Sequence, residues 1–109
     1  IKTIYLLFKK RIILIMKTNK KGEKMKNQID NKSLYYVEQG NNTIYYSYNT
    51  CVAVTNSVDT YVCENVWSVT TAKHLNRIEE ITGSNREYRM KYNDFRDFCI
   101  KNKINETYN

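Results

Sequence analysis

The chain has 109 residues and a formal net charge of +7, from 18 Lys and Arg against 11 Asp and Glu. A chain of this length forms one domain rather than two, and it leaves little buried area around a deep catalytic cavity. Its three cysteines show no spacing typical of a zinc site, and without a clear export signal we expect reduced thiols in a cytosol. Composition therefore disfavours a multidomain enzyme, a zinc protein and a secreted disulfide scaffold.

The first 24 residues are predicted to be a translated leader. The stretch KKGEKM back-translates to a purine-rich ribosome-binding sequence ahead of an ATG codon, so Met25 is the predicted first residue. A membrane segment or signal peptide is the alternative, but Lys9, Lys10 and Arg11 interrupt the apolar run. Neither remaining part is long enough to span a bilayer. We therefore expect no membrane partner.

Whether the chain starts at residue 1 or at Met25 changes its net charge. Residues 1–24 hold eight of the basic residues and one of the acids, so residues 25–109 hold ten of each sign. Their net charge is zero. The basic surplus that would indicate a nucleic-acid binder disappears if the chain starts at Met25.

Residues 25–33 are polar and are predicted to be a loose N-terminus. The next segment is rich in Tyr, Val and Thr, which favours strands. Residues 34–39 and 43–49 flank Gly40-Asn41-Asn42 and form a predicted hairpin.

A second hairpin is predicted from residues 51–55 and 60–64, with a short strand following at residues 66–69. A loop centred on Ser57 would pair Val52 with Val62 and Cys51 with Cys63. A disulfide between these two cysteines on air oxidation is left open.

Residues 70–83 form the clearest helix, with Thr70 or Thr71 as N-cap and Gly83 at its C-terminal end. Residues 87–92 alternate polar and apolar side chains, which predicts a strand with Arg89 and Lys91 on a basic outer face.

A last helix is predicted with Asn93 or Asp94 as its N-cap and an apolar stripe of Phe95, Phe98 and Cys99. The predicted fold is α+β. It has an antiparallel meandering sheet of four to five strands, packed by one main helix, then a further strand and a C-terminal helix. The domain spans residues 34–104, and residues 105–109 are a predicted frayed tail.

Reactive side chains are densest at the predicted helix start. Two threonine hydroxyls, Lys73 and His74 lie beside unpaired amide groups and the positive end of the helix dipole, where a phosphate or carboxylate can bind. The structural alternative makes one threonine a cap and His74 a partly buried histidine, hydrogen-bonded to a neighbouring strand or loop. Lys73 and Arg77 would then form a solvated face near Glu80.

No catalytic arrangement stands out. The single histidine limits the chain to one Cys-His pair, and the cysteines lie in predicted strands or on a core stripe, where thiols are inert. The carboxylates are scattered, and there is no glycine-rich phosphate loop. We therefore predict a binding protein rather than an enzyme, with no cofactor and no metal.

Nine of the ten tyrosines follow Met25. Consecutive tyrosines in a strand place one ring on each face of the sheet. We therefore expect Tyr45, and either Tyr35 or Tyr36, to be exposed as a stacking or protein-binding surface.

Two segments, YYSYNTCVAVTN and WSVTTAKHLNRI, resemble small uncharacterised proteins of bacteriophages and related mobile elements. The resemblance covers about residues 44–78 and combines a Tyr-Ser-Tyr-Asn-Thr strand with a Ser-x-Thr-Thr-x-Lys-His helix start. Cys51 departs from it, because those proteins often have proline there. The resemblance implies a phage or prophage origin, the cytoplasm of a bacterial host, and the following residues for testing: Tyr46, Tyr48, Asn49, Thr70, Thr71, Lys73 and His74.

Two functions follow from these observations. In the first, the protein is an accessory protein that contacts nucleic acid through Thr70 to His74, Arg77, and the basic face at Arg89 and Lys91. In the alternative, it is an inhibitor of a host function, of the anti-defence or anti-CRISPR kind, and binds a host or phage protein through a tyrosine-rich face at Tyr45.

Overall fold

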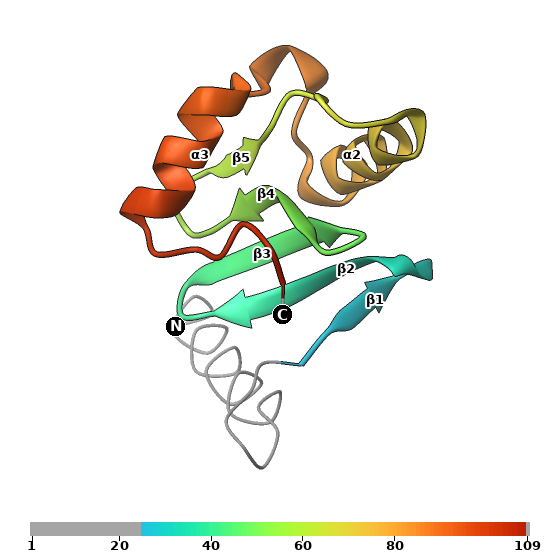
Figure 1. Ribbon diagram of the computed structural model, residues 1–109, viewed down its shortest axis with the longest axis horizontal. Helices are drawn as coiled ribbons and strands as arrows, with labels where there is room; N and C mark the ends of the chain where they lie inside the picture. Colours follow the sequence, from blue (N-terminus) through green and yellow to red (C-terminus); the bar gives the residue numbers. More distant parts are fainter. Residues whose placement is uncertain (1–24, 109) are drawn as a thin grey trace, which may run out of the picture.

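The computed structural model describes residues 25–108, so the predicted leader lies outside the described residues. One antiparallel sheet has the order β1-β2-β3-β4-β5, in which each strand pairs with the next along the chain (Figure 1). Two helices and a short 3-10 turn follow the sheet. The predicted α+β meander is confirmed. The bounds are β1 Asn27–Ile29, β2 Asn31–Gln39, β3 Asn42–Ser47, β4 Thr50–Thr55, β5 Thr60–Val62, α2 Val69–Thr82, η1 Arg86–Tyr88 and α3 Tyr92–Lys101.

The first predicted hairpin is present as β2 and β3. Gly40 has a left-handed backbone with φ of 60°, which a glycine adopts without a steric cost in a tight turn. Across the hairpin, Tyr35 lies opposite Tyr46 and Tyr36 lies opposite Tyr45. Aromatic cross-strand pairs of this kind stabilise a sheet.

The two helices cover opposite faces of the sheet, and β4 and β5 run between them (Figure 1). On one face, Leu75 and Ile78 of α2 pack against residues that include Leu34, Tyr45 and Val62. The other face carries α3 and Ile104 of the segment after it, and its cluster is Tyr35, Val37, Ile44, Tyr46, Cys51, Val54, Cys63, Phe95, Cys99 and Ile104.

Covering both faces buries Tyr45 and Tyr35 and leaves Tyr36 half-buried, although we expected Tyr45 and one of the other two to be exposed. Tyr45 is only 5% exposed and Tyr35 only 1%, so the prediction of an exposed Tyr45 is wrong. The alternation of the two rings was predicted correctly, but each ring meets a helix or the C-terminal segment instead of solvent. Burial raises the pKa of Tyr35 and of Tyr45 to about 12, so both hydroxyls stay protonated well above neutral pH.

Both ends of the described chain are paired, in contrast to the prediction. Residues 25–33 were expected to be loose, yet β1 pairs with β2 through a bulge, with Asn27 opposite Tyr36. The predicted frayed tail also packs. The N–H of Cys51 donates to the carbonyl of Glu106 at 2.7 Å, and the N–H of Tyr108 donates to the carbonyl of Asn49 at 2.9 Å. The partner of β1 is the next strand along the chain, whereas the partners of the C-terminal segment are far away in the sequence.

The second hairpin is present, but its register differs by one residue from the prediction. Ala53, rather than Val52, lies opposite Val62. The side-chain oxygen of Asn56 accepts hydrogen bonds from the N–H groups of Val58 and Asp59, which moves the centre of the loop beyond Ser57.

The register also decides the environment of the cysteines. All three are free and buried, and Cys51 does not lie opposite Cys63. A hydrogen bond between the thiols of Cys51 and Cys99 raises the pKa of Cys51 and lowers the pKa of Cys99. Burial raises the pKa of Cys63 to about 12. Raised pKa values of this kind disfavour the reactive thiolate of Cys51 and Cys63.

Two predicted strands are absent at their expected positions. Residues 66–69 form a loop and the start of α2, because the side-chain oxygen of Asn65 accepts from the N–H of Trp67 in a local turn. Residues 87–92 contain the end of η1 and a single parallel bridge between Met90 and Cys63. The further strand in the predicted fold is therefore wrong.

Within residues 25–108, no helix combines the length and the apolar composition that crossing a bilayer requires.

Candidate functional site

The start of α2 is joined to the sheet by hydrogen bonds around His74. Its Nδ1 atom lies 2.6 Å from the hydroxyl of Ser47 in β3, and its Nε2 atom lies 3.4 Å from the hydroxyl of Ser33 in β2. The side chain is 7% exposed, and burial lowers its pKa below the usual 6.5. The ring is therefore neutral at pH 7, and the predicted structural role of His74 is confirmed.

The N-cap of α2 is Ser68, and the prediction of Thr70 or Thr71 is wrong. The hydroxyl of Ser68 accepts from the N–H of Thr71 at 3.2 Å. Thr71 is buried, and its hydroxyl lies 3.3 Å from that of Ser47. The turn at Asn65, whose side-chain amide donates to the carbonyl of Ser68, places the helix start earlier than composition indicated.

These contacts bring together the two segments that carry the resemblance. Ser47 ends β3 and Tyr48 follows it in the turn, and Thr71 and His74 come from the first turns of α2. The ring of Tyr48 lies against the ring of His74 with centroids 5.6 Å apart. Two motifs that are separated along the chain therefore form one structural unit.

A pocket of about 440 Å³ opens beside this unit. Four of the predicted site residues line this pocket, and helical spacing had already placed them on neighbouring turns. They are Thr70, Lys73, His74 and Arg77. Its lining residues are Ile29, Asp30, Asn31, Ser33, Leu34, Tyr48, Thr70, Lys73, His74 and Arg77.

Tyr48 forms an aromatic rim of the pocket. The side chain is 54% exposed, and its backbone has a left-handed φ of 59°, which is uncommon for a bulky residue. The N–H of Tyr48 donates to the carbonyl of Ser33 at 2.7 Å, which fixes the turn. The sequence marked Tyr48 only through the resemblance. The signal that points to its exposure is its place in the tight connection between β3 and β4.

The two cations of the pocket differ in their partners. Arg77 forms ion pairs with Asp30 at 2.8 Å and with Glu80 at 2.6 Å, as the helical spacing to Glu80 predicted. Hydrogen bonds to these carboxylates raise the pKa of Arg77. Lys73 is exposed and has no ion-pair partner among residues 25–108. Lys73 is therefore the cation available to an anionic ligand in this pocket.

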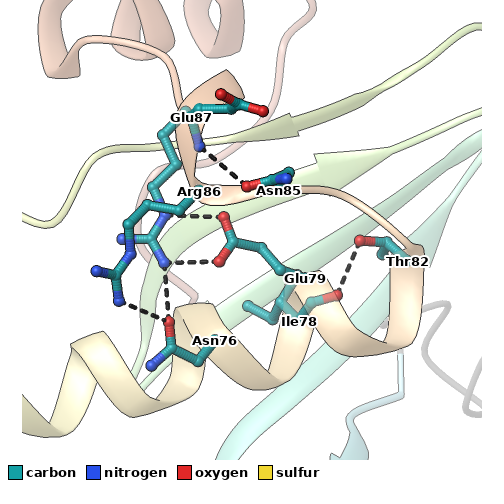
Figure 2. Close-up of polar contacts among 8 residues, drawn as sticks. Asn76, Ile78, Glu79, Thr82, Asn85, Arg86 and Glu87 are labelled. Carbon is teal, nitrogen blue, oxygen red and sulfur yellow. Dashed lines mark hydrogen bonds and ion pairs between the residues drawn. The ribbon is translucent and has the colours of Figure 1, made fainter.

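The remaining predicted site residues lie elsewhere. Arg89 was placed on the outer face of a strand, but its guanidinium donates to both carboxylate oxygens of Glu79 in α2, at 2.8 and 2.7 Å. Figure 2 shows Glu79 and Asn76 on the side of α2 that faces this segment. Lys91 is exposed at the start of α3, and Tyr45 lies in the core. The predicted basic strand face is therefore wrong, because a buried carboxylate on α2 attracts Arg89.

The groups relevant to catalysis are metal ligands and nucleophiles. No group of three His, Cys, Asp or Glu side chains within residues 25–108 is arranged to hold a metal ion. Ser47 approaches a histidine as a nucleophile would, but it is buried beneath Thr71 and His74. The arrangement holds the ring of Tyr48 against His74 and leaves 54% of the Tyr48 side chain exposed.

Fold and site together define a small α+β domain with one helix on each face of a meander sheet and an open pocket at the start of α2. The chain belongs to a family of unknown function, DUF8033, whose family model matches residues 16–94. None of the curated proteins and none of the solved structures matches the chain significantly.

Proposed function

We propose that this chain is a non-catalytic binding protein that takes single-stranded nucleic acid at the start of α2. One base stacks on Tyr48, and a neighbouring phosphate lies at Lys73. The observation that carries the proposal is the exposed Tyr48 ring, fixed at the rim of a pocket that also contains a lysine without a partner among the described residues.

Stacking supplies most of the affinity in this proposal. A base that stacks on an aromatic side chain contributes about 1–3 kcal/mol as measured by alanine substitution. Tyr48 suits this role because His74 supports one side of its ring while more than half of the side chain remains exposed. The neutral imidazole of His74 adds no charge of its own.

Basic side chains contribute less to the proposed affinity for nucleic acid than we expected from the sequence. Arg89 is engaged with Glu79, and Arg77 is engaged with Asp30 and Glu80. Lys73 supplies the one phosphate contact of the proposal at this pocket, and Lys91, the other exposed cation of the predicted basic surface, lies at the start of α3. Because each contact to single-stranded nucleic acid contributes about −0.7 to the slope of log K against log salt, we expect a shallow slope of about −0.7.

The test is a titration of a fluorescent oligothymidine, followed by anisotropy over a series of salt concentrations. Tyr48→Asn removes the ring and keeps a residue that tolerates the left-handed backbone. Lys73→Gln removes the cation. We expect Tyr48→Asn to weaken binding about tenfold and Lys73→Gln to flatten the salt dependence.

Two variants serve as matched controls. Tyr88→Asn removes an exposed tyrosine near the other end of α2, and Lys101→Gln removes an exposed lysine from α3. Both are expected to bind like the parent protein. Equal losses in test and control variants, or binding that does not weaken as salt rises, would contradict the proposal.

A phage origin, a bacterial host cytoplasm and inhibition of a host function remain predictions from the resemblance. The sheet face at Tyr45 is no longer the surface that we propose for a protein partner, because α2 covers it. A pull-down from bacterial lysate with and without nuclease separates the two functions. A partner that survives nuclease treatment and does not depend on Tyr48 would favour a protein.

A further inference from the structure

A second pocket lies at the other end of α2, and nothing in the proposed nucleic-acid function uses it. Its volume is about 680 Å³, within the range of about 300–1,000 Å³ typical of small-molecule sites. It opens between the start of β5, the end of α2 and the segment after η1. The side chains that matter here are Asp59, Tyr61, Tyr88 and Met90.

The charge at this pocket is negative. Asp59 is the only charged side chain among the described residues that line it, and it has no ion-pair partner within residues 25–108. The last turn of α2 contains no basic residue, so the negative end of the helix dipole at Gly83 is not compensated from within the helix.

The nearest arginines are held outside this pocket. Arg86 donates to the side-chain oxygen of Asn76 at 3.4 Å, and Figure 2 shows it directed back along α2. Arg89 is bound to Glu79 and also to Asn76. These contacts keep both guanidinium groups on the flank of α2, so the carboxylate of Asp59 remains available.

Aromatic side chains form the other part of the pocket. Tyr88 is 73% exposed. Tyr61 is half-buried, and its ring stacks on Phe98 with centroids 4.2 Å apart, which fixes its orientation. The face of an aromatic ring attracts cations, and quaternary ammonium groups are recognised by several such rings together. The sulfur of Met90 adds a polarisable contact.

We infer that this pocket binds a small organic cation that carries an ammonium or quaternary ammonium group. The cationic head lies against Tyr61 and Tyr88, near the carboxylate of Asp59 and the carbonyl end of α2. A neutral apolar molecule would use the rings but not the charge, and an inorganic cation would use the charge but not the rings. Only an organic cation uses both.

The test uses the full chain with choline chloride as the probe. Its neutral carbon isostere, 3,3-dimethylbutan-1-ol, is the matched control, and sodium chloride controls for ionic strength. Binding is followed by protein-detected NMR through backbone amides. We expect saturable shifts in choline at residues 59–61 and 82–90, with millimolar affinity, and an affinity for the isostere roughly fivefold weaker. Equal affinity for choline and the isostere, or no saturable shift, would overturn the inference.

Variants locate the site. Tyr88→Ala removes the most exposed ring, and Asp59→Asn removes the charge while its amide oxygen still accepts from the N–H of Thr60. Each is expected to weaken choline binding about threefold. Tyr48→Asn, at the opposite end of α2, is expected to leave it unchanged. If Tyr48→Asn weakens choline binding as much as Tyr88→Ala does, the assignment to this pocket is wrong.

Discussion

The two ends of α2 differ in charge although each has an open pocket and an exposed tyrosine. At the start, Tyr48 lies beside Lys73 and the neutral ring of His74. At the end, Tyr88 lies beside Asp59. Helices are usually stabilised by acidic residues in the first turn and basic residues in the last, by about 0.3–1 kcal/mol each. This helix has neither, so both ends of its dipole remain available to ligands of opposite charge.

The ends also differ in how they are attached to the rest of the molecule. Neutral hydrogen bonds from His74 and Thr71 to Ser47 hold the start of α2 on the sheet. An ion pair between Glu79 and Arg89 holds the later turns. Substitution and pH change the stability contributed by neutral hydrogen bonds and by an ion pair to different extents. Variants at the two ends of α2 therefore test the comparison.

The largest effect is expected from Glu79→Ala. The side chains of Glu79 and Arg89 are 9% and 11% exposed, so the variant leaves a guanidinium buried without its partner. We expect the free energy of unfolding to fall by about 3–5 kcal/mol, measured by urea denaturation.

The control for Glu79→Ala is the double variant Glu79→Leu, Arg89→Met, because it removes both charges together. It is expected to recover most of the loss. Arg77→Met, in the middle of the helix, removes an exposed cation and is expected to change stability little. A loss below about 1 kcal/mol in Glu79→Ala would show that water replaces the missing partner.

At the start of α2, Ser47→Ala leaves Nδ1 of His74 without its hydrogen bond in a buried position. We expect a loss of about 1–3 kcal/mol, measured in the same way. Ser57→Ala in the exposed loop before β5 is the matched control and is expected to be neutral. Equal stability of the two variants would show that the serine hydroxyl contributes nothing to the attachment.

The helix caps are expected to have smaller and similar effects. Ser68→Ala removes the hydrogen bond to the N–H of Thr71 and is expected to cost about 1 kcal/mol. Gly83→Ala forces an alanine to φ of 75°, with no atom near the added methyl group, and is expected to cost about 1–2 kcal/mol. Thermal unfolding measures both. Gly83→Asn should cost less than Gly83→Ala, since asparagine tolerates this backbone; the reverse order would point to a cause other than φ.

The smallest effect is a pH dependence that only the start of α2 carries, because the chain has a single histidine. Burial lowers the pKa of His74 below its unfolded value of 6.5, so the unfolded chain binds a proton more readily than the folded one. Stability is therefore fully present above about pH 6.5 and declines as the pH falls through the folded pKa.

Urea denaturation at about pH 7.5 and about pH 5.5 measures this decline. His74→Gln should be less stable at the higher pH and should change less between the two. An unchanged pH dependence in that variant would assign the effect to other groups.

Much of the candidate site was predictable because local patterns carry it. The clustering of Thr70, Lys73, His74 and Arg77 follows from helical spacing alone. The place of Tyr48 in the pocket does not, since it depends on a left-handed turn packing against a helix that begins 21 residues later in the chain, at Val69. The pocket beside Tyr88 was also missed, because residues 87–92 alternate like a strand and only contact with Glu79 turns Arg89 inward.

By itself, the sequence determined the meander and the main helix ending at Gly83. Strand alternation, helical periodicity and turn residues are local signals that a sequence contains directly. Tertiary structure alone decided that both faces of the sheet are covered, that Tyr45 is buried, and that the C-terminal segment is paired. These outcomes depend on which surfaces meet after folding, and a partner distant in the chain leaves no local signal in the residues that it buries.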